Sequence, residues 1–258
     1  MSKIYDAIEH AEKDKRVSRE ELRLFETRST QRVTMQRESR TVQSNGKVSI
    51  SARAMEEYNH LKQSIISLIP TTRPRALLFA SSTEDEGNSN VVASFSMVLA
   101  SAGERLLLVD ANLRNPVLHE LFAVGKNHGM AELLSGQETL QQVIKPTHVA
   151  NLSLVTAGSQ LQNPSALFEP GKTDAIVRLT KAEADWVLFD APVISAFNDA
   201  IALSPGMDGV VLVVRAEKTR WEVAQNARER LESGKANILG VVLNDRKLRI
   251  PGWIYRRL

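Results

Sequence analysis

Three apolar segments of this 258-residue chain are each followed by residues that could bind phosphate or a metal ion. The segment 76–80 leads into the loop Ser-Ser-Thr-Glu-Asp-Glu-Gly-Asn-Ser-Asn at 81–90, and two later segments end in Asp110 and Asp190. Loops at the carboxyl ends of parallel strands lead into helix N-termini, whose backbone amides bind phosphate. Carboxylates at the same edge can hold magnesium or polarise a water or hydroxyl. Together these features predict a nucleotide-type site.

The loop at 81–90 departs from an intact phosphate-binding loop at its central cation. In the pattern G-x-x-x-x-G-K-[ST], backbone amides hold the phosphate, the Lys neutralises it and the hydroxyl contacts magnesium. Gly87 and Ser89 stand at the second Gly and at the hydroxyl position, but Asn88 stands where the Lys belongs. The expected nucleotide contacts are Glu86, Gly87, Asn88, Ser89 and Asn90, and the expected magnesium ligands are Ser89, Asp110 and Asp190.

A simpler interpretation is open for each acidic residue. An Asp at the end of a strand commonly caps the turn that follows it, and for one such Asp alone we prefer this interpretation. A glycine-containing loop, a first Asp and a second Asp in this order favour the nucleotide-type site over unrelated caps.

Aliphatic runs alternate with helical stretches from residue 76 onward. Near-continuous aliphatic strands separated by helices indicate a parallel sheet that is covered on both faces. We therefore predict an α/β fold with a doubly wound, mainly parallel sheet, of the P-loop type. The predicted strands are 76–80, 105–110, 152–157, 186–190, 209–214 and 238–243.

The sequence before residue 51 predicts an arm attached to this domain. Residues 1–26 indicate an amphipathic helix that packs on its own domain or docks on another chain. Residues 27–50 are polar with scattered apolar residues and predict a flexible linker, because they bury too little surface to offset the entropy of ordering. Residues 51–258 then form the domain, beginning with a helix at 51–68.

Composition limits the cellular setting. The chain has no cysteine, which fits a reducing cytoplasm. Its formal net charge of +3 is a mild excess, so we expect no nucleic-acid partner. The N-terminus lacks the apolar core of a signal peptide, and no apolar run approaches the roughly 18 residues that cross a bilayer. We expect a cytoplasmic protein that meets a membrane only through a partner or through surface attraction.

The segments 80–90, 106–116 and 187–192 resemble the Walker A, Walker A′ and Walker B motifs of bacterial tyrosine kinases (BY-kinases). These are the cytoplasmic kinase domains of capsule and exopolysaccharide co-polymerases, within the wider class of ParA/MinD-type ATPases. The resemblance extends from about residue 52 to the C-terminus. Further similar stretches are 163–167, 197–200 and 240–244.

This resemblance implies an activity, cofactors and partners. It implies ATP- and magnesium-dependent tyrosine autophosphorylation that regulates the length and export of a polysaccharide. The implied partner is a membrane chain-length determinant, or polysaccharide co-polymerase, which would hold the chain at the inner membrane. The stretch 56–62 is similar to an E-x-x-R-x-x-R oligomerisation motif, which implies a homo-oligomer formed through the helix at 52–66.

The resemblance also implies roles for single residues. Asp110, Asp190 and Arg114 are the implied catalytic residues of an active member. Asn244 is similar to a residue that contacts the adenine base, although a turn-forming Asn explains it equally well. Asp199 is similar to a residue near the active site, or it caps the helix that follows.

The departures from the family pattern affect residues that are expected to bind phosphate or take part in the reaction. Asn88 cannot neutralise phosphate, Asp85 replaces a Gly beside the phosphate path, and Asn112 replaces a second Asp after the second strand. Arg114 is the one cation we name as a substitute for the lost Lys. The family's C-terminal tyrosine cluster is reduced to Tyr255, within a basic tail at 246–258 that could contact a partner, an anionic membrane or its own domain.

These departures lead to three hypotheses. The first is a pseudokinase, a fold retained for binding partners after catalysis was lost. The second is an active tyrosine kinase or weak ATPase that uses another cation. The third is a ParA/MinD-like positioning ATPase, which would also need an intact loop.

Overall fold

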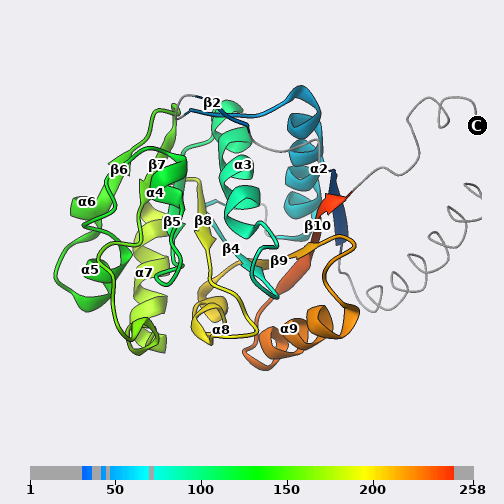
Figure 1. The fold of residues 1–258 in the computed structure, drawn as a ribbon. Coiled ribbons are helices and arrows are strands. Elements are labelled where there is room, and N and C mark those ends of the chain that lie inside the picture. The colour runs from blue at the N-terminus through cyan, green and yellow to red at the C-terminus, as the bar shows by residue number, and fades with distance from the viewer. Residues whose placement is uncertain (1–30, 37–41, 45–46, 70–72, 247–258) are drawn as a thin grey trace, which may run out of the picture.

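Ten strands and eight α-helices have defined bounds in the computed structural model, which describes residues 31–36, 42–44, 47–69 and 73–246 (Figure 1). The strands are β1 Gln31–Gln36, β2 Val42–Ser44, β3 Lys47–Ser49, β4 Arg75–Ser81, β5 Leu106–Asp110, β6 Ile144–Pro146, β7 Leu152–Val155, β8 Trp186–Asp190, β9 Gly209–Arg215 and β10 Ile238–Arg246. The α-helices are α2 Ala52–Leu68, α3 Asn88–Ser101, α4 Leu118–Leu121, α5 Met130–Ser135, α6 Leu140–Val143, α7 Pro170–Glu183, α8 Asp199–Leu203 and α9 Trp221–Ser233. Two 3₁₀ turns are η2 Pro164–Leu167 and η3 Ser204–Gly206.

Eight of these strands form one sheet in the order β1-β10-β9-β4-β8-β5-β7-β6. Every neighbouring pair is parallel except β6 and β7, which are antiparallel. The hairpin of β2 and β3 stands apart from this sheet. The order confirms the predicted doubly wound, mainly parallel sheet of the P-loop type.

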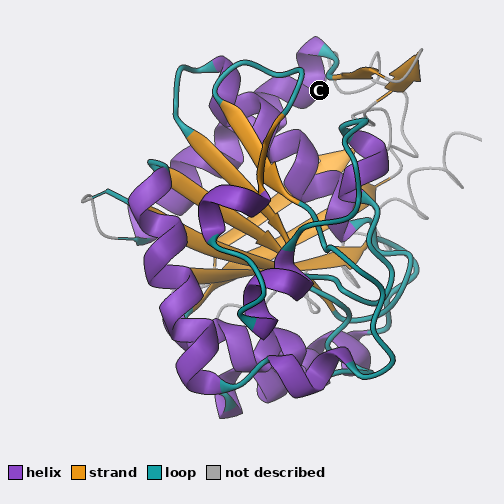
Figure 2. Ribbon diagram, turned by 90° about the vertical axis from the view of Figure 1, so that its left-hand side faces the viewer, coloured by secondary structure: helices purple, strands orange, loops and turns teal. Residues whose placement is uncertain are grey.

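Helices cover both faces of the sheet, as Figures 1 and 2 show. Alternate residues of β4 enter two separate cores, with Leu78 in one and Leu77 and Phe79 in the other. Helices α5, α6, α7, α8 and α9 complete the first core, and α2, α3 and α4 complete the second. A strand that is buried on both faces must be apolar throughout, which explains the continuous aliphatic runs in the sequence.

Helix α2 packs on the second core through one stripe. The hydroxyl of Ser51 accepts a hydrogen bond from the Ala54 amide at 3.2 Å and caps the helix. Tyr58, Leu61 and Ile65 follow at spacings of three and four and are buried. The helix predicted at 51–68 is therefore present and uses its apolar face within its own domain.

The structure differs from the linker expected at 27–50. Part of that stretch forms β1, which lies at the edge of the sheet and pairs in parallel with β10, with Gln31 opposite Gly240. An edge strand needs main-chain partners on one side only, so its polar composition is tolerated. Met35 supplies the buried contact and is 1% exposed. Main-chain pairing with β10 leaves no trace in the composition of this stretch.

Two predicted segments lie outside the described residues. These are the helix at 1–26 and the tail beyond Arg246, and both stay predictions. None of the helices that the structure describes combines the length and apolarity that a bilayer crossing requires.

Truncation of Phe95 tests the second core. Its fully buried ring lies 5.8 Å from that of Phe79 and 6.4 Å from those of Tyr58 and Trp186, measured between centroids. We expect Phe95→Ala to lower the free energy of unfolding by about 3–5 kcal/mol in urea denaturation. Leu179→Ala, at a side chain that is 53% exposed, should change it by less than about 0.5 kcal/mol. Similar losses in the two variants would contradict this packing.

Candidate functional site

The three predicted phosphate-site segments meet at one edge of the sheet. Strand β8 lies between β4 and β5, with Asp190 opposite Asp110 on one side and opposite Phe79 on the other. Both carboxylates end their strands and are fully buried. The loop after β4 leads from the same edge into α3. The predicted convergence is confirmed, while the catalytic, magnesium and nucleotide roles of these residues stay predictions.

Gly87 shapes the turn into α3. It has φ of +83° at the N-cap position, and a Cβ atom there would lie 2.4 Å from Nδ2 of Asn244. Only glycine satisfies both the left-handed backbone and this close approach. The Asn244 amide donates to the carbonyl oxygen of Glu86 at 2.8 Å. Asn244, predicted as an adenine contact or a turn residue, therefore holds the loop backbone from β10.

The Glu86 carboxylate points into the protein and not toward a ligand. It is 2% exposed, accepts a hydrogen bond from the Ser82 hydroxyl at 2.7 Å and accepts another from the Thr83 amide at 2.9 Å. The Thr219 hydroxyl also donates to it from the connection between β9 and α9. Because these donors come from the protein, the loop keeps its shape without a phosphate. Thr219 was missed from the sequence, since it lies far along the chain and in no recognisable motif.

Asn88 directs its amide toward the sheet. Its Nδ2 donates to Oδ1 of Asp190 at 2.7 Å and to the carbonyl oxygen of Phe79 at 2.9 Å, and the Ala191 carbonyl lies at 3.3 Å. A primary amide has two N–H donors, so this group has none left for a phosphate. Its Oδ1 is buried and has no hydrogen-bond partner within the described part of the chain.

Burial and proximity shift the two strand-end carboxyls in the same direction. Burial raises the pKa of Asp190, and burial together with the charge of Asp190 raises the pKa of Asp110 well above its usual range. The backbone amides of Leu118 and Asn112, and the charge of Lys126, act in the opposite direction on Asp110. Two adjacent buried carboxyls without a cation retain protons that exposed ones release.

Arg114 is held by three neighbours. Its Nε lies 3.2 Å from the buried Asp199 carboxylate, and its Nη2 donates to the Ser165 hydroxyl at 2.6 Å. The guanidinium carbon also lies 3.6 Å from the centre of the Phe197 ring. Asp199, predicted as an active-site residue or a helix cap, acts here as the partner of Arg114. The cation proposed to substitute for the lost Lys is therefore already paired.

A hollow of about 240 Å³ opens beside these groups. Residues from 84–90, 112–117 and 191–197 form its wall, and they include Ser89, Asn90 and Arg114. Ser89 and Asn90, which the sequence predicted as nucleotide contacts, line the hollow, and that role stays a prediction. Asp110 and Asp190 lie beneath its surface and do not line it.

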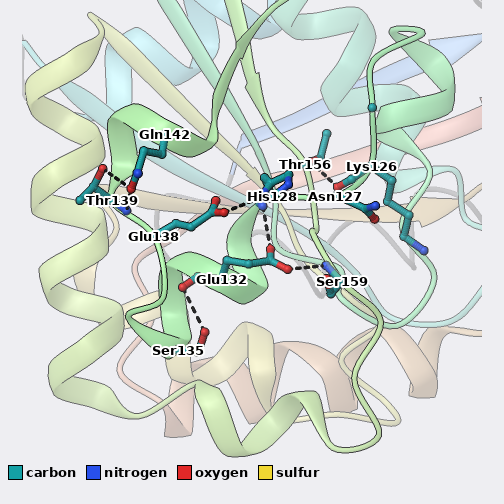
Figure 3. Close-up of polar contacts among 12 residues, drawn as sticks. Lys126, Asn127, His128, Glu132, Ser135, Glu138, Thr139, Gln142, Thr156 and Ser159 are labelled. Carbon is teal, nitrogen blue, oxygen red and sulfur yellow. Dashed lines mark hydrogen bonds and ion pairs between the residues drawn. The ribbon is translucent and has the colours of Figure 1, made fainter.

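A second polar cluster braces the next strand end, as Figure 3 shows. Glu132 accepts from the backbone amides of Gly129 and Ser159, at 2.8 and 3.0 Å. Lys145 donates to the Thr156 hydroxyl at 2.6 Å and to two carbonyl oxygens of the adjoining loop. Both side chains therefore bind mainly to backbone groups of adjoining loops, which gives them a structural role. It was not predicted, because its members are scattered singly along the sequence.

The described residues do not fit MgATP. The loop offers no free cation, since Asn88 is neutral and Arg114 is paired with Asp199. Glu84 and Asp85 instead place exposed negative charge on the rim, and close charges repel by about 1 kcal/mol per pair even in water.

Comparisons with known proteins give a consistent set of relatives. The chain is 30% identical over 193 residues to tyrosine-protein kinase YwqD of Bacillus subtilis (strain 168), covering 75% of this chain and 81% of that protein. It is 33% identical over 171 residues to tyrosine-protein kinase CpsD of Streptococcus agalactiae, covering 66% and 75%. No family model matches the chain.

Solved structures agree with these relatives. The kinase domain of Escherichia coli tyrosine kinase ETK matches with a TM-score of 0.77 and 25% identity, over 85% of this chain and 91% of that one. The septum site-determining protein MinD of Pyrococcus horikoshii shares the fold, with a TM-score of 0.59 and 22% identity, over 71% of this chain and 76% of that one.

We expect Asp190→Asn to stabilise the fold, and to do so more at pH 8 than at pH 5. Burial raises the pKa of Asp190 to about 7, so the folded chain keeps a proton that the unfolded chain releases near the ordinary value of 3.8. Wild-type stability therefore falls as pH rises between these two values, and the amide removes that loss. The gain measured by urea denaturation should be larger at pH 8 by about 1 kcal/mol or more.

Glu84→Gln is the matched control for this prediction, because it neutralises an exposed carboxylate on the loop that follows β4. It should leave the pH dependence close to that of the wild type. If Asp190→Asn raises the free energy of unfolding equally at pH 5 and pH 8, the raised pKa of the buried Asp190 is contradicted.

Proposed function

The chain belongs to the family of bacterial tyrosine-protein kinases, and from that membership we propose that it is a catalytically impaired member, a pseudokinase of capsule or exopolysaccharide biosynthesis. In this proposal the fold serves as a cytoplasmic partner of a membrane polysaccharide co-polymerase. Its nucleotide site no longer turns over ATP. One observation carries the proposal, namely the inward hydrogen bonds of the Asn88 amide.

The position of Asn88 removes the loop's contribution to phosphate transfer. Catalysis of phosphoryl transfer rests on positioning and on cations that stabilise charge on the transferred group. Here the neutral amide bonds to Asp190 and Phe79. The buried carboxyls below it hold protons more tightly than exposed ones, which opposes metal binding because ligating carboxylates must be deprotonated. The absence of a lysine at residue 88 therefore weakens both the contact with phosphate and the binding of a metal ion.

The tyrosines support the same conclusion. Tyr58 is 4% exposed and packs against Phe95, and burial raises the pKa of its hydroxyl above the usual value. A buried phenol in the core is a poor phosphate acceptor. The other two tyrosines, Tyr5 and Tyr255, lie outside the described residues.

The preserved fold and loop contacts are consistent with a role in binding partners. The sheet, both cores and the loop contacts of Glu86 and Asn244 are formed by the chain's own residues. On α2, Glu56 and Asn59 are exposed and available to a neighbouring copy, whereas Lys62 is bound to Glu104 at 3.2 Å. We propose a weak homo-oligomer through this helix. We also propose that the basic tail contacts the partner or the inner-membrane surface.

Two alternatives from the same family remain to be separated by experiment. An active kinase or weak ATPase would need Arg114 to leave Asp199 and Ser165 and turn to the phosphates. A positioning ATPase of the MinD type would need the same missing cation, and its support is the shared fold alone. Both require nucleotide binding, which the pseudokinase proposal does not.

Isothermal titration with MgATP tests the proposal. We expect no binding by the wild-type chain. We expect association by a double variant, Asn88→Lys with Asp85→Gly, because Lys restores the charge and Gly suits the φ of 61° at residue 85. Micromolar MgATP binding by the wild type, or ATP turnover that Asp190→Ala abolishes, would overturn it.

A further inference from the structure

The loop has a left-handed backbone at a residue that is not glycine. Asp85 has φ of +61°, a conformation that costs free energy because its Cβ approaches a backbone carbonyl oxygen. Glycine would adopt this conformation without that cost. A strained backbone of this kind persists only where the surrounding structure holds it. The contacts that hold Asp85 therefore decide the shape of the loop.

Three donors from β9, β10 and the connection after β9 hold residues 85 and 86. Nη1 of Arg215 donates to the carbonyl oxygen of Asp85 at 3.3 Å. Nδ2 of Asn244, which lies opposite Arg215 in the sheet, donates to the carbonyl oxygen of Glu86 at 2.8 Å. The Thr219 hydroxyl donates to the Glu86 carboxylate and accepts from the Arg215 amide at 3.1 Å. Arg215 therefore takes part in two of these three contacts.

Asp245 anchors the guanidinium of Arg215. Nε and Nη2 both donate to Oδ2 of Asp245, at 2.9 and 2.5 Å. The side chain of Asp245 is 7% exposed and that of Arg215 is 23% exposed, so the pair is largely shielded from water. Hydrogen bonds between charged groups are stronger than neutral ones, and the planar guanidinium fixes the direction of its remaining donors. Because two of its nitrogens bind Asp245, the third is held toward the Asp85 carbonyl.

Fixing this carbonyl also fixes the amide of the same peptide group. A peptide bond is planar and trans, so its N–H points away from its C=O. Since the Asp85 carbonyl accepts from Arg215, the Glu86 amide faces the opposite way. In the pattern G-x-x-x-x-G-K-[ST], loop amides of this kind contact phosphate. Arg215 thus sets the direction of a loop amide, although it lies 130 residues further along the chain than Asp85.

We propose that Arg215, anchored by Asp245, is the positioning residue that holds the loop in its left-handed turn at Asp85. Its guanidinium stabilises a backbone conformation that glycine would adopt unaided. Loss of either member of the pair frees the turn, whether or not a nucleotide binds. The inference therefore goes beyond the proposed function and does not depend on it. An ion pair that only joined the ends of β9 and β10 would leave the loop unchanged when it was removed.

NMR order parameters of the backbone amides in the full chain test this proposal. In the wild type, the amides of residues 85–87 should be close to the value of about 0.85 that is typical of rigid backbone. Arg215→Met retains an aliphatic stem without the guanidinium, and should lower these values below about 0.6. Asp245→Asn should lower them by a smaller amount, because a neutral amide anchors the guanidinium less strongly than a carboxylate does. Asn also tolerates the φ of +59° at residue 245.

Arg228→Met is the matched control. Arg228 is 17% exposed and is paired with Glu232 at 2.8 Å within α9, so the variant removes a similarly shielded guanidinium from another part of the domain. It should leave the order of residues 85–87 as it is in the wild type.

Three results would overturn the proposal. Unchanged order at 85–87 in Arg215→Met would show that Asn244 and Thr219 hold the loop without Arg215. An equal loss of order in the loop and along β9 and β10 would show that the pair only joins the strand ends. Unchanged order in Asp245→Asn would show that Asp245 does not anchor Arg215. None of these results bears on MgATP binding, which decides the proposed function separately.

Discussion

The hydrogen bond between the Asn88 amide and Asp190, 2.7 Å long, is the constraint on which the site depends. It joins the first turn of α3 to the end of β8 with a neutral donor at the position where the pattern G-x-x-x-x-G-K-[ST] has a lysine. A neutral donor can hold the geometry of this junction, but it cannot compensate two buried carboxyls. Burial raises the pKa values of both Asp110 and Asp190, and the Asn88 hydrogen bond opposes this rise at Asp190 only in part.

The rest of the loop is held by interactions that need no ligand. Glu86 accepts hydrogen bonds from Ser82 and Thr219. Asn244 on β10 donates to the loop backbone, and Gly87 allows its side chain to approach closely. Arg114 is similarly fixed by Asp199 across the site. Preorganisation of this kind is usual in functional sites. Here it preserves the shape of a phosphate-binding loop, although the loop lacks the lysine charge that would neutralise a bound phosphate.

The fold could be predicted well from the sequence, because the aliphatic runs that mark its strands are continuous. Strands buried on both faces must be aliphatic at every position, so β4, β8 and β9 were visible without tertiary information. The convergence of Asp110 and Asp190 followed from their places at strand ends. Edge strand β1 was missed, because main-chain pairing compensates for a polar sequence and leaves no periodic pattern.

The partners of the site residues were harder to predict. Thr219 reaches Glu86 across more than a hundred residues, and Asp199 binds Arg114 from the start of α8. Such pairs depend on how loops meet in space, and sequence spacing does not contain that information. The replacement of Lys by Asn88 was visible at once, but the direction of its amide required the structure. That direction distinguishes a weakened phosphate site from one whose donors are already occupied.

A crystal structure of the chain grown with excess magnesium and a non-hydrolysable ATP analogue would test this account most directly. The account predicts that Asn88 Nδ2 remains within hydrogen-bonding distance of Asp190 and that no triphosphate is seen along the loop. A triphosphate on the amides of 86–90, with Asn88 or Arg114 turned toward it and a metal ion at Asp110 or Asp190, would contradict it.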